Sequence, residues 1–186
     1  MGMPDTARHY TVDDVLAFPD DGNRYELVDG ELLVTPAPAP RHQRVVGRLF
    51  TGLAGYLVAH RGLAEAFLAP ADITWSRERL VQPDVFVVPS TEVSDRWATY
   101  QTVLLAVEVV SPSSARGDRL VKRRLYQRQR VATYWIVDPD ARLVEVWHPD
   151  DERPEIVTDV LRWRVAPDAD ELVIPLRELF ESLPLR

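Results

Sequence analysis

Two apolar runs in the middle of the chain constrain the fold more than any other feature: VQPDVFVVP (81–89) and VLLAVEVVSP (103–112). Both are rich in β-branched residues and are bounded by proline, serine or charged segments, which is typical of strands. Strands with so few polar residues belong to a sheet that is covered by other elements, whereas a half-solvated strand alternates apolar and polar residues. We therefore expect a central, partly buried sheet flanked by helices.

The segments around these runs predict the other elements. Asp29-Gly30 is a dipeptide that a tight type I′ turn prefers, so RYELVDGELLVT (24–35) predicts an N-terminal β-hairpin. Apolar residues at helical spacing predict a long helix in HQRVVGRLFTGLAGYLVAHRG (42–62). This order favours an α/β (α+β) fold with a mixed central β-sheet. The remaining expected elements are a short helix capped by Thr11, an extended proline-rich connection at 35–42, strands in 63–75 and on both sides of Asp138-Pro139-Asp140, a helix in 118–132 and a short final helix in 174–183.

The length of 186 residues fits one domain, 1–186, whose core needs no disulfide or metal for stability. Cysteine is absent, which excludes disulfides and thiolate metal sites. The N-terminal sequence lacks the basic and apolar regions of a secretory signal, and no run of about 18 apolar residues occurs. We therefore expect a cytoplasmic protein without a membrane segment.

The net charge of −7 is unevenly distributed. The segment ARGDRLVKRRLYQRQR (115–130) contains seven Arg or Lys residues and one acid, which leaves a charge of −13 on the rest of the chain. A phosphate backbone responds to the local field, so a basic helix on an acidic protein is compatible with nucleic-acid contact. The alternative is an ordinary solvated helix face.

Each of the two apolar runs carries one carboxylate that does not fit its surroundings. Glu108 lies inside VLLAVEVV, and Asp84 follows Pro83 where its strand begins. On a strand, Asp84 shares a face with Phe86. If the two strands are aligned neighbours, the carboxylates converge, and a divalent cation relieves their repulsion. Oxygen ligands without cysteine or clustered histidine favour Mg²⁺ or Mn²⁺. The alternative is that each acid pairs with an arginine at a strand end.

Lys122 lies on the apolar face of the predicted helix in 118–132. At 100° per residue, Asp118, Lys122 and Tyr126 form one column. An inward lysine that follows a strand with an inward glutamate predicts an ion pair between the two. The alternative is that the lysine stem covers apolar surface while its amine reaches water. The preceding SPSS (111–114) is expected to end the strand and to cap this helix.

An aspartate, a glutamate and a lysine on two strands and the following helix suit phosphodiester hydrolysis. The carboxylates would hold a divalent ion, which polarises the phosphate and activates a water molecule. The ammonium would orient that water or offset the developing negative charge. We therefore expect Asp84, Glu108 and Lys122 to be catalytic residues, with Mg²⁺ or Mn²⁺ as cofactor.

The chain also resembles a known family, the putative restriction endonucleases, formerly a domain of unknown function, within the PD-(D/E)XK nuclease superfamily. The resemblance spans about residues 10–180 and depends on the combination of its segments. It implies a restriction-endonuclease-like fold and Mg²⁺-dependent cleavage of DNA. The matching parts are RYELVDGEL (24–32), His42, QPDVFVV (82–88), LAVEVVSPSS (105–114), Asp118, Lys122, Tyr126 and YWIVDP (134–139).

The resemblance also implies roles for single residues. Pro83-Asp84 corresponds to the PD element, and Glu108 corresponds to the second acid. The superfamily usually has its lysine two residues after that acid, where this chain has Val110. The family shows the same departure, with the lysine moved to the following helix at Lys122. By the same resemblance, the backbone carbonyl of Val109 is a further metal ligand.

Other residues are candidates for accessory roles. Glu26 could add a carboxylate to the site, or it could be an ordinary glutamate of a half-exposed strand. His42 could orient a ligand or a phosphate, or it could be a cap of its helix or a surface residue. Asp118 and Tyr126 share the column of Lys122. The arginines on the same helix are expected phosphate contacts: Arg119, Arg123 and Arg124.

These features together predict a Mg²⁺-dependent DNA endonuclease. The net negative charge outside the basic helix predicts weak affinity for DNA. A homodimer or a preference for a particular substrate would then have to supply the rest of the affinity. Trp97 and Trp147 are the expected exposed residues of a dimer surface. The alternative is a catalytically inactive nucleic-acid-binding or assembly module on the same fold.

Overall fold

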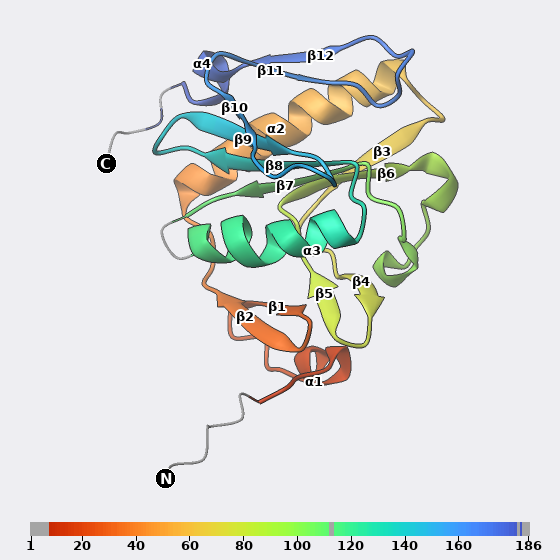
Figure 1. The fold of residues 1–186 in the computed structure, drawn as a ribbon, viewed down its shortest axis with the longest axis vertical. Helices are drawn as coiled ribbons and strands as arrows, with labels where there is room; N and C mark the ends of the chain where they lie inside the picture. Colours follow the sequence, from red (N-terminus) through yellow and green to blue (C-terminus); the bar gives the residue numbers. More distant parts are fainter. Residues whose placement is uncertain (1–7, 112–113, 182, 184–186) are drawn as a thin grey trace.

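The structure is a computed structural model that describes residues 8–111, 114–181 and 183 (Figure 1). Its helices are α1 (Val12–Leu16), α2 (Pro40–Ala59), α3 (Arg123–Arg128) and α4 (Leu176–Leu179), with the 3₁₀ turns η1 (Ser90–Glu92) and η2 (Trp97–Thr99) and the π-helical segment η3 (Gly117–Lys122). Its strands are β1 (Arg24–Val28), β2 (Glu31–Thr35), β3 (Ala64–Leu68), β4 (Ile73–Ser76), β5 (Arg79–Val81), β6 (Val85–Pro89), β7 (Leu105–Val109), β8 (Thr133–Asp138), β9 (Leu143–Trp147), β10 (Glu155–Val157), β11 (Val160–Trp163) and β12 (Leu172–Pro175).

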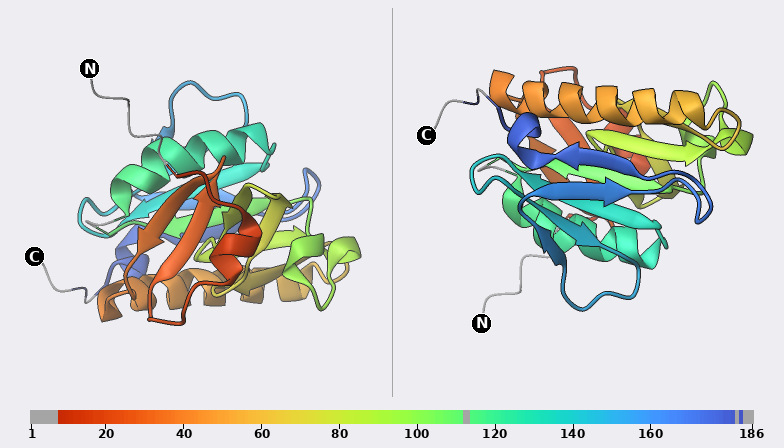
Figure 2. Two further views of the ribbon diagram at one scale, coloured as in Figure 1. Left: turned by 90° about the horizontal axis from the view of Figure 1, so that it is seen from below. Right: turned by 90° about the horizontal axis from the view of Figure 1, so that it is seen from above.

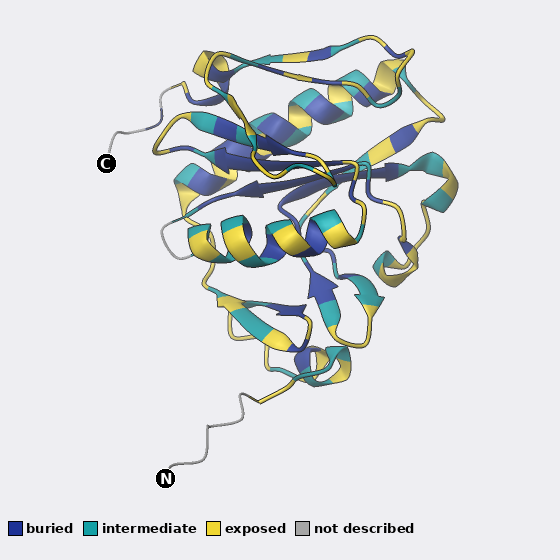
Figure 3. Cartoon of the chain, in the orientation of Figure 1, coloured by how far each residue is buried: buried dark blue, intermediate teal, exposed yellow. Residues whose placement is uncertain are grey.

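A six-stranded sheet with the order β10-β9-β8-β7-β6-β3 forms the centre of the fold. Strands β7 and β8 are parallel, and the other neighbouring pairs are antiparallel. All residues of β7 are buried, as its apolar sequence requires (Figure 3). The expectation of a mixed, buried central sheet with helices around it is therefore confirmed.

The two faces of this sheet are covered by different elements (Figure 2). Helix α2, the β11–β12 hairpin and α4 cover one face, and α3 with a smaller sheet covers the other. Alternate residues of β7, together with the residue that follows it, divide between them: Val107 and Val109 face α2, whereas Ala106 and Val110, just past the strand, face α3. We call the two sets of packed side chains the α2 layer and the α3 layer. The α2 layer includes Val45, Leu49, Leu53, Val85, Val107, Trp135 and Leu161, and the α3 layer includes Ile73, Phe86, Ala106, Leu125, Tyr126, Tyr134 and Ile136.

Helix α2 forms because its apolar residues recur at spacings of three and four, so one side of the helix can be buried. Leu49, Leu53 and Leu57 lie on that side. The helix begins at Pro40, two residues earlier than predicted, because proline fits the first helical turn, where its missing N–H has no partner to lose. No helix in the described ranges, α2 included, is both long and apolar enough to span a bilayer.

The smaller sheet has the order β2-β1-β5-β4 and carries the predicted N-terminal hairpin. Asp29 (φ 50°) and Gly30 (φ 81°) both have positive φ, as a type I′ turn demands. Thr11 caps α1 together with Asp14, also as expected. Val28 and Ile73 of this sheet belong to the α3 layer, so the two sheets share a core.

Two of the runs with strand composition are divided between the two sheets. The run 63–75 contains β3 in the central sheet and β4 in the smaller one. The run 81–89 leaves β5 at Val81 and enters β6 at Val85. Pro70 and Pro83 lie at the two breaks, where proline has no N–H for a strand ladder. The chain therefore passes between the sheets just before Asp84.

The helix after β7 differs from a regular α-helix. Arg123 N donates to Asp118 O, five residues earlier, which defines a π-helical turn in η3. At its start, Ser114 N donates to Ser111 Oγ and Ser111 N donates to Ser114 Oγ. This reciprocal pair satisfies free amides at the end of the strand and the start of the helix, as predicted for SPSS; Pro112 and Ser113 of that motif lie outside the described residues.

Two further findings differ from the sequence expectations. Strands β10, β11 and β12 were not predicted, because they have only three or four residues. Trp147 is only 8% exposed and packs under the guanidinium of Arg123. The prediction that it is an exposed residue of a dimer surface is therefore wrong. Trp97 is half-buried against Phe67 and Tyr100.

Candidate active site

Asp84 and Glu108 lie at the same end of the central sheet because β6 and β7 are antiparallel neighbours. Val85 pairs with Val107 in this ladder. One position further along, Asp84 lies opposite Glu108. Their exposed fractions are only 3% and 1%. The expectation that the two strands are adjacent and aligned is confirmed.

The side chain of Asp84 turns to the boundary between the two layers instead of sharing a face with Phe86. Asp84 precedes the first paired residue of β6, so the strand does not fix its direction. Its Oδ2 accepts a hydrogen bond from Val109 N at 2.8 Å and lies 3.0 Å from His42 Nε2. An ionised carboxylate only accepts, so Nε2 of His42 carries the proton. Helix α2 therefore contributes a direct partner to Asp84.

Arg24 is the third partner of Asp84, and the sequence analysis did not single it out. Its NH1 donates to Asp84 Oδ1 at 2.8 Å and to Gln82 O at 3.1 Å. Burial alone would raise the pKa of Asp84, but the His42 hydrogen bond and the Arg24 charge lower that pKa to about 2. Arg24 lies two residues before Glu26 in β1, so the two side chains lie on the same face of that strand. Because Glu26 was a candidate for the site, this spacing could have indicated Arg24 as well.

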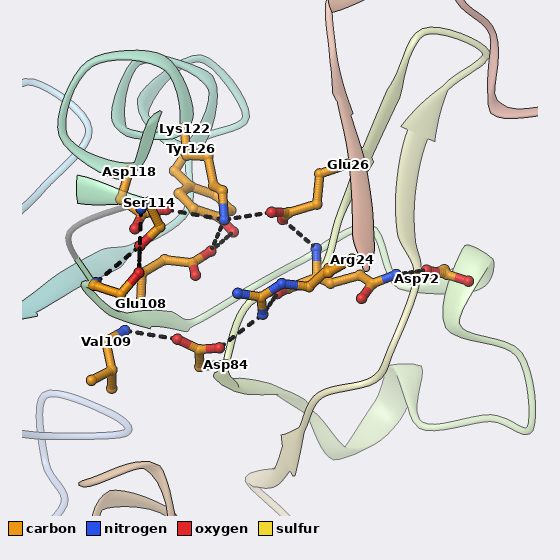
Figure 4. A network of polar contacts seen from close by, with 12 residues as sticks. Arg24, Glu26, Asp72, Asp84, Glu108, Val109, Ser114, Asp118, Lys122 and Tyr126 are labelled. Carbon is orange, nitrogen blue, oxygen red and sulfur yellow. Dashed lines mark hydrogen bonds and ion pairs between the residues drawn. The ribbon is translucent and has the colours of Figure 1, made fainter. Parts of the chain in front are cut away.

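Lys122 is the centre of a buried charged cluster in the α3 layer (Figure 4). Its Nζ lies 2.7 Å from Glu26 Oε2 and 3.1 Å from Glu108 Oε1. The third carboxylate is Asp118, whose Oδ1 is also 3.1 Å away. The four side chains are at most 3% exposed, so the lysine amine does not reach water. The predicted Lys122–Glu108 pair is present, and Glu26 belongs to the cluster.

Tyr126 completes the column predicted for this helix. Its hydroxyl donates to Glu108 Oε1 at 3.0 Å. Burial raises the pKa of Tyr126, and the neighbouring Glu108 charge raises it further, so the phenol keeps its proton as a donor. Asp118 and Lys122 face the same side of the helix because they are four residues apart, and they stay within ion-pair distance across the π-turn of η3.

Burial has opposite effects on the acid and the base at the centre of this cluster. It raises the pKa of Glu108 well above its usual value, since Lys122 only partly offsets the loss of hydration. Burial alone would lower the pKa of Lys122, but the charges of Asp118, Glu108 and Glu26 outweigh it, and the net pKa is raised. Lys122 is therefore firmly charged, whereas Glu108 readily holds a proton.

The arginines beside this column have different surroundings. Arg119 forms ion pairs with Asp138 at 2.8 Å and Glu145 at 2.6 Å, on β8 and β9. Arg123 donates to Arg119 O and lies over the Trp147 ring. Arg124 is exposed. The structure thus leaves Arg124 open to solvent, while Arg119 and Arg123 are engaged within the fold.

The site contains more carboxyl groups than cations. If all are ionised, Arg24 and Lys122 leave an excess of two negative charges, which one divalent cation or bound protons would balance. No three His, Asp or Glu side chains in the described part of the chain converge as a ready metal site. The oxygen donors nevertheless fit the chemistry of Mg²⁺ or Mn²⁺. The four carboxyl groups are those of Glu26, Asp84, Glu108 and Asp118.

Comparisons with known proteins agree with this architecture. The sequence model of a family described as "Putative restriction endonuclease" matches residues 12–176. Among solved structures, a putative nuclease belonging to DUF820 from Anabaena variabilis aligns with a TM-score of 0.75 and 22% sequence identity, over 91% of this chain and 97% of that chain. At this identity the likeness is one of fold. No curated protein matches the chain. The family match, which covers most of the sequence, shows that the chain belongs to the family of putative restriction endonucleases.

Proposed function

We propose that the protein is a divalent-metal-dependent endonuclease that hydrolyses DNA phosphodiester bonds. The excess of buried carboxyl groups at one end of the central sheet is the observation that carries this proposal. Buried charge of one sign is costly, and a fold retains it only where something compensates it. Asp84 and Glu108, with the backbone carbonyl of Val109, would hold Mg²⁺ or Mn²⁺. Such an ion, when bound, polarises the phosphate and lowers the pKa of a water molecule.

Lys122 is the proposed catalytic lysine. During hydrolysis a water oxygen bonds to phosphorus while the bond from phosphorus to the leaving sugar oxygen breaks, and negative charge grows on the phosphate oxygens. The Lys122 ammonium would donate to those oxygens or to the attacking water. Glu26 and Asp118 hold Lys122 from two sides, and Tyr126 holds Glu108. These contacts fix the positions of the reacting groups before substrate arrives.

We propose DNA as a weakly bound substrate and a homodimer as the assembly that cuts both strands. Weak binding follows from the acidic balance of the chain outside 115–130. Arg124 is the best placed of the three predicted phosphate contacts because it is exposed. Arg119 and Arg123 would first have to leave their partners on β8 and β9.

The test combines metal binding and cleavage in the same samples. Mg²⁺ and Mn²⁺ are titrated by calorimetry into the wild type, Asp84→Asn and Glu108→Gln, and nicking of supercoiled plasmid is followed for these proteins and for Lys122→Met. The matched control is Glu171→Gln, which removes a carboxylate paired with Arg162 on the distant β11–β12 hairpin.

We expect metal binding in the wild type and the control only, and nicking to require all three residues of the site. A wild type that binds neither ion at millimolar concentration and nicks no plasmid would contradict the proposal. In that case the acids serve the fold, and the inactive binding module becomes the better description.

A further inference from the structure

A cavity of about 530 Å³ opens beside Asp84. It lies between the β1–β2 hairpin, the start of α2 and the connection from β3 to β4, and its volume is within the range of roughly 300–1,000 Å³ that small-molecule sites occupy. Phe18, Pro19 and Tyr25 contribute apolar and aromatic lining. Such surfaces suit the sugar and base of a nucleotide. The cavity therefore has both the size and the lining for one nucleotide unit.

Arg24 is the cation of the site that faces this cavity. It lines the cavity together with Asp84, and its side chain is 19% exposed. The Lys122 side chain is only 3% exposed and does not line the cavity. A ligand that enters the cavity meets the guanidinium of Arg24 before it meets the buried cluster.

The guanidinium of Arg24 has donors to spare. Its hydrogen bonds to described residues all come from NH1, which donates to Asp84 (Figure 4) and to the backbone carbonyl of Gln82. Nε and NH2 make no hydrogen bond within the described part of the chain. Two adjacent guanidinium donors match two oxygens of a phosphate in a bidentate arrangement. The same guanidinium also shields the incoming phosphate from the negative charge of Asp84.

We propose that Arg24 is a phosphate-binding residue, which grips a nucleic-acid phosphate in this cavity through Nε and NH2 and holds it next to Asp84. This inference rests on the proposed nuclease function, and it adds a substrate contact and an approach route to the site. It also explains why a charged arginine is kept in a half-buried strand position: its pairing with Asp84 holds the guanidinium in place before the substrate arrives.

The test measures binding without turnover. Fluorescein-labelled 12-nucleotide DNA, single-stranded and duplex, is titrated with protein in EDTA at several salt concentrations, and anisotropy is recorded. We expect Arg24→Gln to weaken binding about tenfold and to reduce the salt slope by roughly one phosphate contact. Arg79→Gln is the matched control, because Arg79 lies in the same sheet and also pairs with an aspartate, Asp29, but lies away from the cavity. Its effect should stay within about twofold.

A double-mutant cycle separates phosphate binding from a purely structural role. Asp84→Asn removes a negative charge and loosens Arg24, so we expect tighter DNA binding, and we expect most of this gain to disappear in the Arg24→Gln background. Thermal unfolding checks that each variant folds. If Arg24→Gln does not fold, Arg24→Lys is used in its place. For this variant we expect an unchanged salt slope and about threefold weaker binding, because lysine keeps the charge but lacks the two adjacent donors of the guanidinium.

The outcomes distinguish this inference from the function on which it rests. If Arg24→Gln or Arg24→Lys binds DNA as tightly as the wild type does, the proposed role of Arg24 is wrong. The same holds if the tighter binding of Asp84→Asn persists when Arg24 is also replaced. Both outcomes leave the nuclease proposal standing. A wild type that binds neither oligonucleotide overturns both.

Discussion

The two layers that cover the central sheet achieve burial by opposite means. The α2 layer is built from aliphatic and aromatic side chains, with Leu49 and Leu53 of α2 against Val107 of β7. The α3 layer uses the other face of the same strands but includes Glu108 and Lys122 at 1% and 2% exposure. Apolar burial stabilises by roughly 25 cal/mol per Å² and needs no specific partner. Buried charges must recover a desolvation cost of several kcal/mol per ion through matched partners.

The difference assigns separate tasks to the two faces. The α2 layer secures the sheet, so the α3 layer can contain groups that a stable core would exclude. Asp84 lies at the boundary between the two layers, where His42 contacts it from one side and Arg24 from the other. Four substitutions test this contrast, and they follow in order of decreasing effect on stability.

Lys122→Met should cause the largest loss of stability. It leaves Glu26, Glu108 and Asp118 without their shared cation, and removing one partner of a buried ion pair typically costs about 3–5 kcal/mol. Burial already raises the pKa of Glu108, and without the ammonium of Lys122 that pKa would rise further above its unfolded value. The loss should thus be greatest at neutral pH and shrink as the pH falls toward 4. Urea unfolding between pH 4 and pH 8 measures it, and a loss that does not vary with pH would contradict this account.

Leu53→Ala tests the apolar side of the comparison. The side chain is fully buried in the α2 layer, and such truncations cost about 2–5 kcal/mol in lost burial and cavity formation. No titratable group is involved, so the loss should be the same from pH 5 to pH 8. Plasmid nicking per folded molecule should equal that of the wild type. A pH-dependent loss like that of Lys122→Met would show that the layers are not energetically distinct.

Glu108→Gln should stabilise the protein while abolishing its proposed activity. Burial raises the pKa of Glu108, so its contribution to stability is present below its unfolded pKa and declines as the pH rises through the folded pKa. Glutamine resembles the protonated acid and can still accept from Lys122 and Tyr126. We expect about 1 kcal/mol more stability at pH 8 and no gain near pH 4. The control Glu145→Gln changes a carboxylate outside the Lys122 cluster; a loss of stability in Glu108→Gln would refute the idea.

His42→Ala should have the smallest effect, concentrated on Asp84. The pKa of Asp84 is lowered to about 2, so its contribution is present above its unfolded pKa near 4 and is lost as the pH falls toward 2. Without the His42 donor this pKa should rise, and stability at pH 7 should drop by about 0.5 kcal/mol. Carbon-13 NMR titration of the Asp84 carboxyl measures the change. Gln43→Ala, an exposed neighbour, should leave the titration unaltered.

Features of the sequence that act locally allowed much of this structure to be predicted. The turn at Asp29-Gly30 follows from two positive φ angles, and α2 follows from one apolar stripe. Asp84 and Glu108 were found because a charge inside an apolar strand requires compensation. Lys122 was found because a cation on an apolar helix face does too.

The partners of these residues could not be predicted in the same way. Arg24 and Asp84 are 60 residues apart, and His42 and Asp84 are 42 apart, so only the tertiary fold brings them together. Pro70 marks the break in the run 63–75, but the sheet that each half joins depends on contacts with segments far apart in the sequence. The π-turn of η3 has the same apolar spacing as an α-helix and gives no separate signal.

The π-turn also affects how a change in chain length would act on the site. A π-turn holds one residue more than an α-turn, so it absorbs an extra residue without changing the direction of the side chains that follow. If one residue of 117–122 were deleted and the turn became an α-turn, the side chains of α3, Tyr126 among them, would keep nearly their present direction. A deletion within α3 itself would instead rotate every helical side chain beyond it by about 100°. The segment between β7 and β8 therefore has one place, the π-turn, where losing a residue would leave the side chains after it pointing at the same partners.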